Sequence, residues 1–388
     1  MKLWKPRGGN TSGHRLPLVV HIGTILAVAL GTAYLLWRLW SGTWALTLTE
    51  GLDDKARFEV AKIVLAIVGG LGGVVFLTIG YRKQRDGEAA ERRNDAAEQR
   101  LDAADAREQS KHFHERFSGA AEQLGSNAAR VRLAGAYSMA ALADDWDAGR
   151  QTCINVLCGY VRAPYQPPGE LDDTADEQDL QQHRAATEER EIRRAILDTI
   201  GERLRAEPVK HKTWHGHRFD LNGAVIDAGD LSRSKITPGT VLNLARATFS
   251  GGDVSFARAK FSGGNVSFPS AKFSGGNVSF FGATFSGGDV SFARAKFSGG
   301  IVSFPSATFS GGIVSFVDAK FSGGIVSFPG ADFSGVIVSF EGATFSGRNV
   351  SFAVAKFSGG IVSFARANFS GGKLILTGVR DWSAPPKF

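Results

Sequence analysis

The sixteen residues FSGGDVSFARAKFSGG occupy positions 249–264 and return unchanged at 285–300. Aligned on phenylalanine, eleven copies share a period of twelve residues and the consensus A-x-F-S-G-G-x-V-S-F-x-x, centred on Phe249, Phe261, Phe273, Phe285, Phe297, Phe309, Phe321, Phe333, Phe345, Phe357 and Phe369. Such a short period predicts a solenoid, in which each unit buries its apolar face only against its neighbours. The phrase recurs because the fold is modular, and the recurrence does not indicate a catalytic site.

Local alternation of residue types predicts where the strands lie. In the triplet VSF at 266–268, apolar residues alternate with serine, so valine and phenylalanine point inward. In AKF at 271–273 the lysine points outward by the same rule. The Ser-Gly-Gly-x segments between strands suit tight turns, where glycine adopts positive φ at no steric cost. Coils stacked about 4.8 Å apart would turn the phenylalanines into internal ladders.

Upstream of these copies, apolar residues recur every five positions, at Leu221, Ile226, Leu231 and Ile236. This pattern resembles the pentapeptide-repeat family, whose motif is A-(D/N)-L-x-x, and GDLSR at 229–233 is the closest match. The resemblance covers about 214–376 and implies a right-handed, four-sided β-helix with the central Leu or Phe inward. The N-terminal apolar runs and the segment 122–145 are similar to bacterial membrane-anchored members of that family.

The size of each coil follows from how many copies it holds. Two twelve-residue copies would form a four-sided coil of 24 residues, slightly larger than the coil of the family, whereas one copy would form a thin two-sided solenoid. We favour the larger coil, because two phenylalanines and a valine from each copy are hard to fit inside a flattened coil of one copy.

Two apolar runs near the N-terminus predict a transmembrane hairpin at 17–81, with spans at 17–40 and 58–81. Each run has the ~20 residues that a helix needs to cross a bilayer. The first run ends in tryptophans typical of a membrane interface, and basic residues flank the hairpin on both sides. The positive-inside rule then places residues 1–16 and the C-terminal domains in the cytoplasm. We therefore expect a multi-pass protein of the inner membrane with two spans.

The middle of the chain predicts a charged helical stalk at 82–111 and a small helical domain at 112–213. Apolar residues at helical spacing indicate four helices in this domain, and the acidic, Pro-rich segment 163–187 is expected to be a loop. Cys153 and Cys158 are the only cysteines, which indicates reduced, packed thiols and a cytoplasmic location.

No part of the sequence carries a recognisable catalytic motif. A nucleophile with its base, a Walker loop and a dinucleotide fingerprint are all missing. Histidines gather at 112–114 and in HKTWHGH at 211–217, which has the right ligand type for zinc or nickel but lacks a fourth ligand. We therefore expect no enzyme, no catalytic residues, no cofactor and no metal site.

The net charge of +7 lies in the repeats, because residues from 241 onward include 13 basic and 6 acidic side chains. Some pentapeptide-repeat proteins mimic DNA and bind topoisomerases, but such mimicry needs an acidic rod, so this function is not favoured here. A basic rod could instead contact anionic lipid or nucleic acid. The charges are spread out without an Arg-rich or exposed aromatic cluster, which makes nucleic acid the weaker of these two partners.

The function that we expect is a non-enzymatic, membrane-anchored scaffold facing the cytoplasm, with a protein partner or a second copy of the chain. The β-helix is expected to cover 214–378, and the repeat pattern decays in the segment 379–388 that follows. This tail contains Trp382 and two prolines, which stop further strand pairing. We expect the tail to cap the rod or to form a homodimer contact.

Overall fold

The computed structural model describes residues 54–172, 175–207, 213–347 and 349–388, with scattered positions between 20 and 38. The predicted N-terminal segment, most of the first predicted span and His211 lie outside these residues. The chain divides into two compact units, Met1–Ala106 and Arg107–Phe388.

Helix α2 (Asp54–Leu124) is one continuous helix of 71 residues. It contains both the second predicted span, 58–81, and the predicted stalk, 82–111, without a break between them. Among the described residues, no helix combines the length and the apolar character needed to cross a membrane. This finding contradicts the predicted transmembrane hairpin at 17–81, whose second apolar run lies within one helix that continues through the charged residues 82–111. The inner-membrane location and the cytoplasmic orientation lose this support and stay predictions.

The helical part of the second unit confirms the four helices expected from apolar spacing. It consists of the end of α2 followed by α3 (Ala129–Asp145), the 3₁₀ turn η1 (Asp147–Gly149), α4 (Arg150–Arg162) and α5 (Glu177–Arg205). These helices bury a shared apolar core that includes Met139, Leu142, Ile154, Leu157 and Ile196.

Helix α5 begins earlier than the sequence composition suggested. The carboxylate of Asp176 accepts a hydrogen bond from the N–H of Asp179 at 2.9 Å, and the carboxylate of Asp179 accepts one from the N–H of Asp176 at 3.2 Å. This reciprocal capping box satisfies N–H groups that the first turn of a helix leaves unpaired. The predicted loop at 163–187 is therefore wrong over 177–187, where the acidic residues start a helix.

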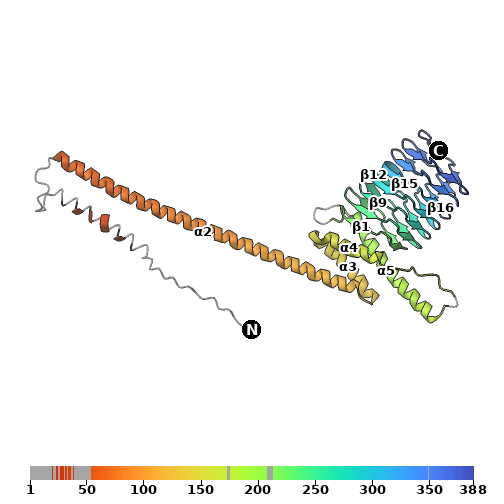
Figure 1. Cartoon of the computed structure of the whole chain (residues 1–388), viewed down its shortest axis with the longest axis horizontal. Coiled ribbons are helices and arrows are strands. Elements are labelled where there is room, and N and C mark those ends of the chain that lie inside the picture. The colour runs from red at the N-terminus through yellow and green to blue at the C-terminus, as the bar shows by residue number, and fades with distance from the viewer. Residues whose placement is uncertain are drawn as a thin grey trace. The chain divides into compact units, whose positions relative to one another are not determined.

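Residues from Arg218 onward form a β-solenoid of short parallel strands, which Figure 1 shows stacked in successive coils. One seven-stranded sheet contains β2 (Val225–Ile226), β6 (Thr248–Phe249), β10 (Lys272–Phe273), β13 (Lys296–Phe297), β16 (Lys320–Phe321), β20 (Thr344–Phe345) and β24 (Asn368–Phe369). A second contains β3 (Gly229–Asp230), β7 (Asp253–Ser255), β11 (Asn277–Ser279), β14 (Ile301–Ser303), β17 (Ile325–Ser327), β21 (Val350–Ser351) and β25 (Leu374–Ile375).

The third sheet has eleven strands, because it joins two rows of the solenoid. Its strands are β1 (Arg218–Asp220), β4 (Lys235–Ile236), β5 (Val241–Asn243), β8 (Lys260–Ser262), β9 (Asn265–Ser267), β12 (Thr284–Ser291), β15 (Thr308–Ser315), β18 (Asp332–Phe333), β19 (Ile337–Ser339), β22 (Lys356–Phe357) and β23 (Ile361–Ser363). In β12 and β15 one strand of eight residues runs across the Ser-Gly-Gly segment and belongs to both rows.

The strand register confirms the larger coil. Lys272 pairs with Lys296 and Val278 pairs with Val302, so neighbours in a sheet are 24 residues apart in sequence. Each coil therefore holds two copies of the repeat and passes through four rows of strands. The four rows agree with the four sides that the pentapeptide resemblance implied.

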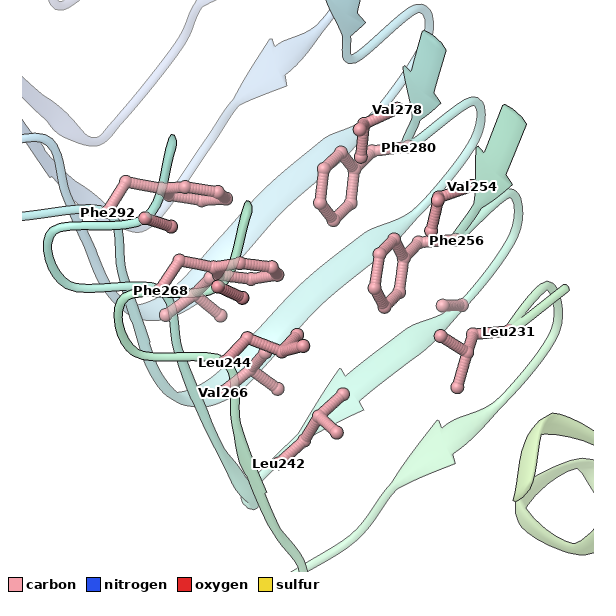
Figure 2. Packing of buried hydrophobic residues seen from close by; sticks show 14 of the residues in the cluster. Leu231, Leu242, Leu244, Val254, Phe256, Val266, Phe268, Val278, Phe280 and Phe292 are labelled. Carbon is pink, nitrogen blue, oxygen red and sulfur yellow. The ribbon is translucent and has the colours of Figure 1, made fainter. Parts of the chain in front are cut away.

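Stacked side chains fill the interior of the solenoid. Phe268 lies over Phe292 with ring centroids 4.6 Å apart, and Phe256 lies over Phe280 at 4.9 Å, with nearly parallel planes in both pairs. Figure 2 shows these pairs, with Leu244 and Leu231 at the matching positions one coil earlier. The spacing follows the distance between stacked strands, about 4.8 Å, so register sets the aromatic geometry.

The two glycines of the segment 298–300 differ in backbone conformation, and a Cβ on either would meet the preceding coil, on Gly300 at 2.2 Å from the carbonyl oxygen of Gly276. Gly300 has a φ of 68°, in the left-handed region that glycine tolerates best. Gly299 does not have a positive φ, but a Cβ there would lie 2.3 Å from the carbonyl oxygen of Ser274 in the preceding coil. Close approach of coils therefore requires the first glycine, which the turn argument from sequence did not identify.

The helical part packs on the first coil, near β1 (Figure 1). On α4, Nε2 of Gln151 donates to the carbonyl of Arg218 at 2.8 Å, and the N–H of Arg218 donates to Oε1 of Gln151 at 2.9 Å. At the end of α5, Arg205 donates to the carbonyl of Asp230 at 2.8 Å. Because these bonds engage backbone groups of the first coil, the helices protect an edge that would otherwise invite strand pairing.

Residues 379–388 pack on the last coils of the solenoid. Phe388 stacks on Phe364 with centroids 5.4 Å apart, and Trp382 lies 5.8 Å from Phe357. The N–H of Lys387 donates to the carbonyl of Val362 at 2.8 Å. The tail therefore continues two of the aromatic ladders, which supports its interpretation as a cap, and the homodimer contact stays a prediction.

Candidate functional site

The 24-residue coil sorts the outward positions of the repeats onto different sides of the solenoid. The residue before the central phenylalanine of each copy alternates between two rows. The first row contains Thr248, Lys272, Lys296, Lys320, Thr344 and Asn368 in register. The second row contains Lys235, Lys260, Thr284, Thr308, Asp332 and Lys356.

The three lysines of the first row, here called the lysine row (Lys272, Lys296 and Lys320), border a groove of about 600 Å³. This basic groove is lined by five cations, one serine and one carboxylate: Arg246, Ser270, Lys272, Arg294, Lys296, Asp318 and Lys320. Arg246, Arg294 and Asp318 come from the turns just before the row and have φ values of 56°, 58° and 56°. The turns thus direct two arginines toward the side that carries the lysines.

The charges of the basic groove are mostly unpaired within the described part of the chain. The lysine row makes no ion pair or side-chain hydrogen bond there, and Arg246 donates only to Oδ1 of Asn222, at 3.1 Å. In the second row, by contrast, Nζ of Lys356 lies 4.0 Å from Oδ2 of Asp332, and Lys235 pairs with Glu207. Like charges on directly paired residues destabilise a sheet, and in the lysine row no ion pair among the described residues offsets this repulsion.

Two further rows expose isoleucine in the later coils. One row pairs Ile301 with Ile325, and the other pairs Ile313 with Ile337 and Ile361. Each of these five side chains is 36–45% exposed. The same rows carry polar residues in earlier coils, including Asn277 and Asn265. We call these five residues the isoleucine rows.

A polar network joins α5 to the first coil. The hydroxyl of Tyr165 donates to Oδ2 of Asp227 at 2.9 Å, and the guanidinium of Arg190 lies 3.5 Å from the same oxygen. Burial raises the pKa of the Asp227 carboxyl, against the opposing effect of Tyr165 and Arg190. Because hydrogen bonds and a cation already satisfy this carboxylate, the network serves to hold the helices on the solenoid. The sequence offered no signal for it, since its members are far apart in the chain.

The histidines singled out from the sequence are held by backbone groups. Nε2 of His215 lies 3.0 Å from the carbonyl of Ala206, and Nδ1 of His217 lies 3.1 Å from the carbonyl of His215. On α2, His114 packs against Trp146 with ring centroids 5.3 Å apart. Within the described ranges no three metal-ligating side chains gather around one point.

The two cysteines are buried and unpaired, which confirms that they are packed thiols. Burial raises the pKa of the Cys153 thiol to about 11 and that of Cys158 to about 12. Thiolates are the reactive form of cysteine, so burial and the raised pKa values disfavour reaction of both side chains at neutral pH. The cytoplasmic location inferred from them is not tested.

Comparisons with known proteins add no relative to this geometry. No family model, no curated protein and no solved structure matched the chain.

Proposed function

We propose that this chain is a non-enzymatic interaction scaffold and that it binds a protein partner through the isoleucine rows. The observation that carries this proposal is the outward exposure of five isoleucines on two sides of the solenoid. Apolar side chains gathered on a surface are typical of sites for protein association.

The fold does not require isoleucine at these positions. Asn265 occupies the same row as Ile313, also lies in a strand, and is likewise followed by a buried valine. The inward phenylalanines are retained in every copy except the last, where Leu376 replaces the second one, whereas the outward residue at this position varies among Asp, Asn, Ile and Lys. The isoleucines therefore add exposed apolar surface without adding to the core.

We also propose that the solenoid belongs with the pentapeptide-repeat proteins. Support comes from the four rows of strands in each coil and from the buried Leu221, Ile226 and Leu231 at five-residue spacing. The twelve-residue unit differs from that family: there the pentads follow one another directly, whereas here seven residues separate successive pentads.

Photo-crosslinking in cells tests the scaffold proposal. A crosslinking side chain at Ser327, beside Ile325, should form discrete protein adducts in the native sequence. Changing Ile313, Ile325 and Ile337 to Asn should abolish these adducts while leaving thermal unfolding unchanged, because Asn is already present in both rows. Adducts of unchanged pattern and yield in the triple variant would rule out the isoleucine rows as the binding surface.

A further inference from the structure

We propose that the basic groove binds a small anion that carries several linked phosphate groups, such as an inorganic oligophosphate or the phosphate chain of a nucleotide. Five cations and one carboxylate line the groove. The three lysines stand in register on adjacent strands and have no anionic partner within the described residues.

The spacing of the cations favours a chain of charges over a single charge. Adjacent strands lie about 4.8 Å apart, so the Cα atoms from Lys272 to Lys320 extend over about 10 Å. One phosphate or carboxylate can approach only part of such a row, whereas linked phosphates can neutralise all three ammonium groups. Arg246 and Arg294, on the flanking turns, add guanidinium groups whose planar geometry suits phosphate oxygens.

The ends of the lysine row favour a small ligand over nucleic acid. Thr248 pairs with the strand of Lys272 at one end, and Thr344 pairs with the strand of Lys320 at the other. Even a single DNA-binding module buries about 600–1,000 Å² of protein surface, which is a much larger area than three lysines on adjacent strands cover. The groove also contains no aromatic side chain on which a base could stack.

Differences between the two nearly identical blocks, 249–284 and 285–320, also affect this side. The blocks differ at six outward or partly exposed positions. Two of these differences place Thr308 where the first block has Lys272, and Lys320 where it has Thr284. Thr308 lies in the second row and Lys320 in the lysine row, so three lysines follow one another on consecutive strands of the lysine row, whereas Thr284, Thr308 and Asp332 separate Lys260 from Lys356 in the second row.

Calorimetric titration of the full chain with inorganic tripolyphosphate at low ionic strength tests the proposal. We expect tighter binding of tripolyphosphate than of orthophosphate, and weaker binding as salt increases. Lys296→Ala, at the centre of the row, should weaken tripolyphosphate binding at least tenfold, while Lys296→Arg should bind like the native chain. The matched control Lys356→Ala, in the second row, should change the affinity less than twofold.

ATP distinguishes the two sources of the phosphate chain. Equal affinity for ATP and tripolyphosphate indicates that the phosphates alone are recognised, and tighter binding of ATP indicates a nucleotide ligand. The proposal is overturned if tripolyphosphate does not bind, or if Lys296→Ala and Lys356→Ala weaken it equally. It is likewise overturned if duplex DNA or phosphatidylserine vesicles bind the chain and tripolyphosphate does not displace them. Unchanged thermal unfolding of Lys296→Ala will show that its effect is on binding.

Discussion

The helical part and the solenoid of the second unit are stabilised in different ways. In the helical part, the buried Arg193 donates to the carbonyls of Val161 and Ala163 at 2.7 and 2.9 Å and to the carboxylate of Glu189 at 3.0 Å. These partners follow no repeat in the chain, so the bonds are particular to Arg193. In the solenoid, each buried phenylalanine repeats the contacts of the one a coil before it.

A position in the solenoid can therefore be interpreted from its place in the repeat, whereas a position in the helices depends on its individual partners. The loss of stability caused by a substitution in the solenoid should therefore depend on the position in the repeat, and inward, glycine and outward positions should form separate classes. Substitutions in the helices should follow the particular bonds that each side chain makes.

The largest effect is expected for an inward phenylalanine. Phe297 is fully buried and stacks on Phe273 and Phe321 at 4.7 and 4.8 Å. Phe297→Ala should lower the free energy of unfolding by about 3–5 kcal/mol, because it leaves a cavity and interrupts a ladder. Denaturant unfolding measures this loss, and the neighbouring outward variant Lys296→Ala should lose less than about 0.5 kcal/mol. Equal losses in both variants would show that the inward and outward classes are wrongly assigned.

Arg193→Met tests the helical side of the comparison. It keeps an unbranched side chain close to the length of the arginine stem but leaves two carbonyls and Oε1 of Glu189 without this donor, so we expect a loss of about 2–3 kcal/mol. The control is Arg194→Met, because the side chain of Arg194 is 54% exposed and its ion pairs contribute less than about 1 kcal/mol. Similar losses in the two variants would mean that the buried hydrogen bonds of Arg193 add little.

Two glycines at the same repeat position test whether close approach of the coils requires glycine. Gly299→Ala should destabilise the chain by about 1–3 kcal/mol, because the new Cβ would meet the carbonyl oxygen of Ser274 at 2.3 Å. Gly251 occupies the same repeat position in the first of the twelve-residue copies, and a Cβ there meets nothing within 4 Å. Gly251→Ala should therefore be neutral or stabilising by about 0.4–1 kcal/mol. Thermal unfolding of both variants measures the difference, which should vanish if only φ matters.

The smallest effect concerns the buried thiols of α4. Burial raises their pKa values from 9.0 to about 11 and 12, so the folded chain keeps protons that the unfolded chain loses above pH 9. Their contribution to stability is complete below pH 9 and decreases as the pH rises, by about 1–2 kcal/mol between pH 9 and 10. The double variant Cys153→Ala and Cys158→Ala should show a flatter pH dependence in denaturant unfolding over this range. An unchanged slope would mean that the thiols ionise in the folded state.

Several features of the fold could be predicted from local pattern alone. The twelve-residue period predicted the solenoid, and alternation in VSF and AKF predicted which residues are buried. Helical spacing predicted four helices near the correct places. Each of these signals depends on neighbouring residues, whose geometry the backbone period dictates.

Other features required contacts between residues far apart in sequence. The start of α5 was missed because acidic residues at 176–179 are equally typical of a loop and of a helix cap. The hairpin at 17–81 was predicted from apolar runs, whereas the structure places 58–81 in one long helix that continues into charged residues. The network around Asp227 joins segments separated by 37 and 62 residues, and no spacing rule connects them.

The twelve-residue period was sufficient to predict a modular solenoid with phenylalanine inside for the C-terminal half, because a strict period leaves each copy only its neighbours to pack against. Which outward residues share a side depends on the three-dimensional coil and does not follow from the repeat alone. A coil of two copies places Lys272, Lys296 and Lys320 in one row and sends Lys260 and Lys356 to another, although all five occupy the same position of the twelve-residue repeat. The basic groove and the isoleucine rows therefore arise from the number of copies that each coil must contain to enclose its phenylalanines.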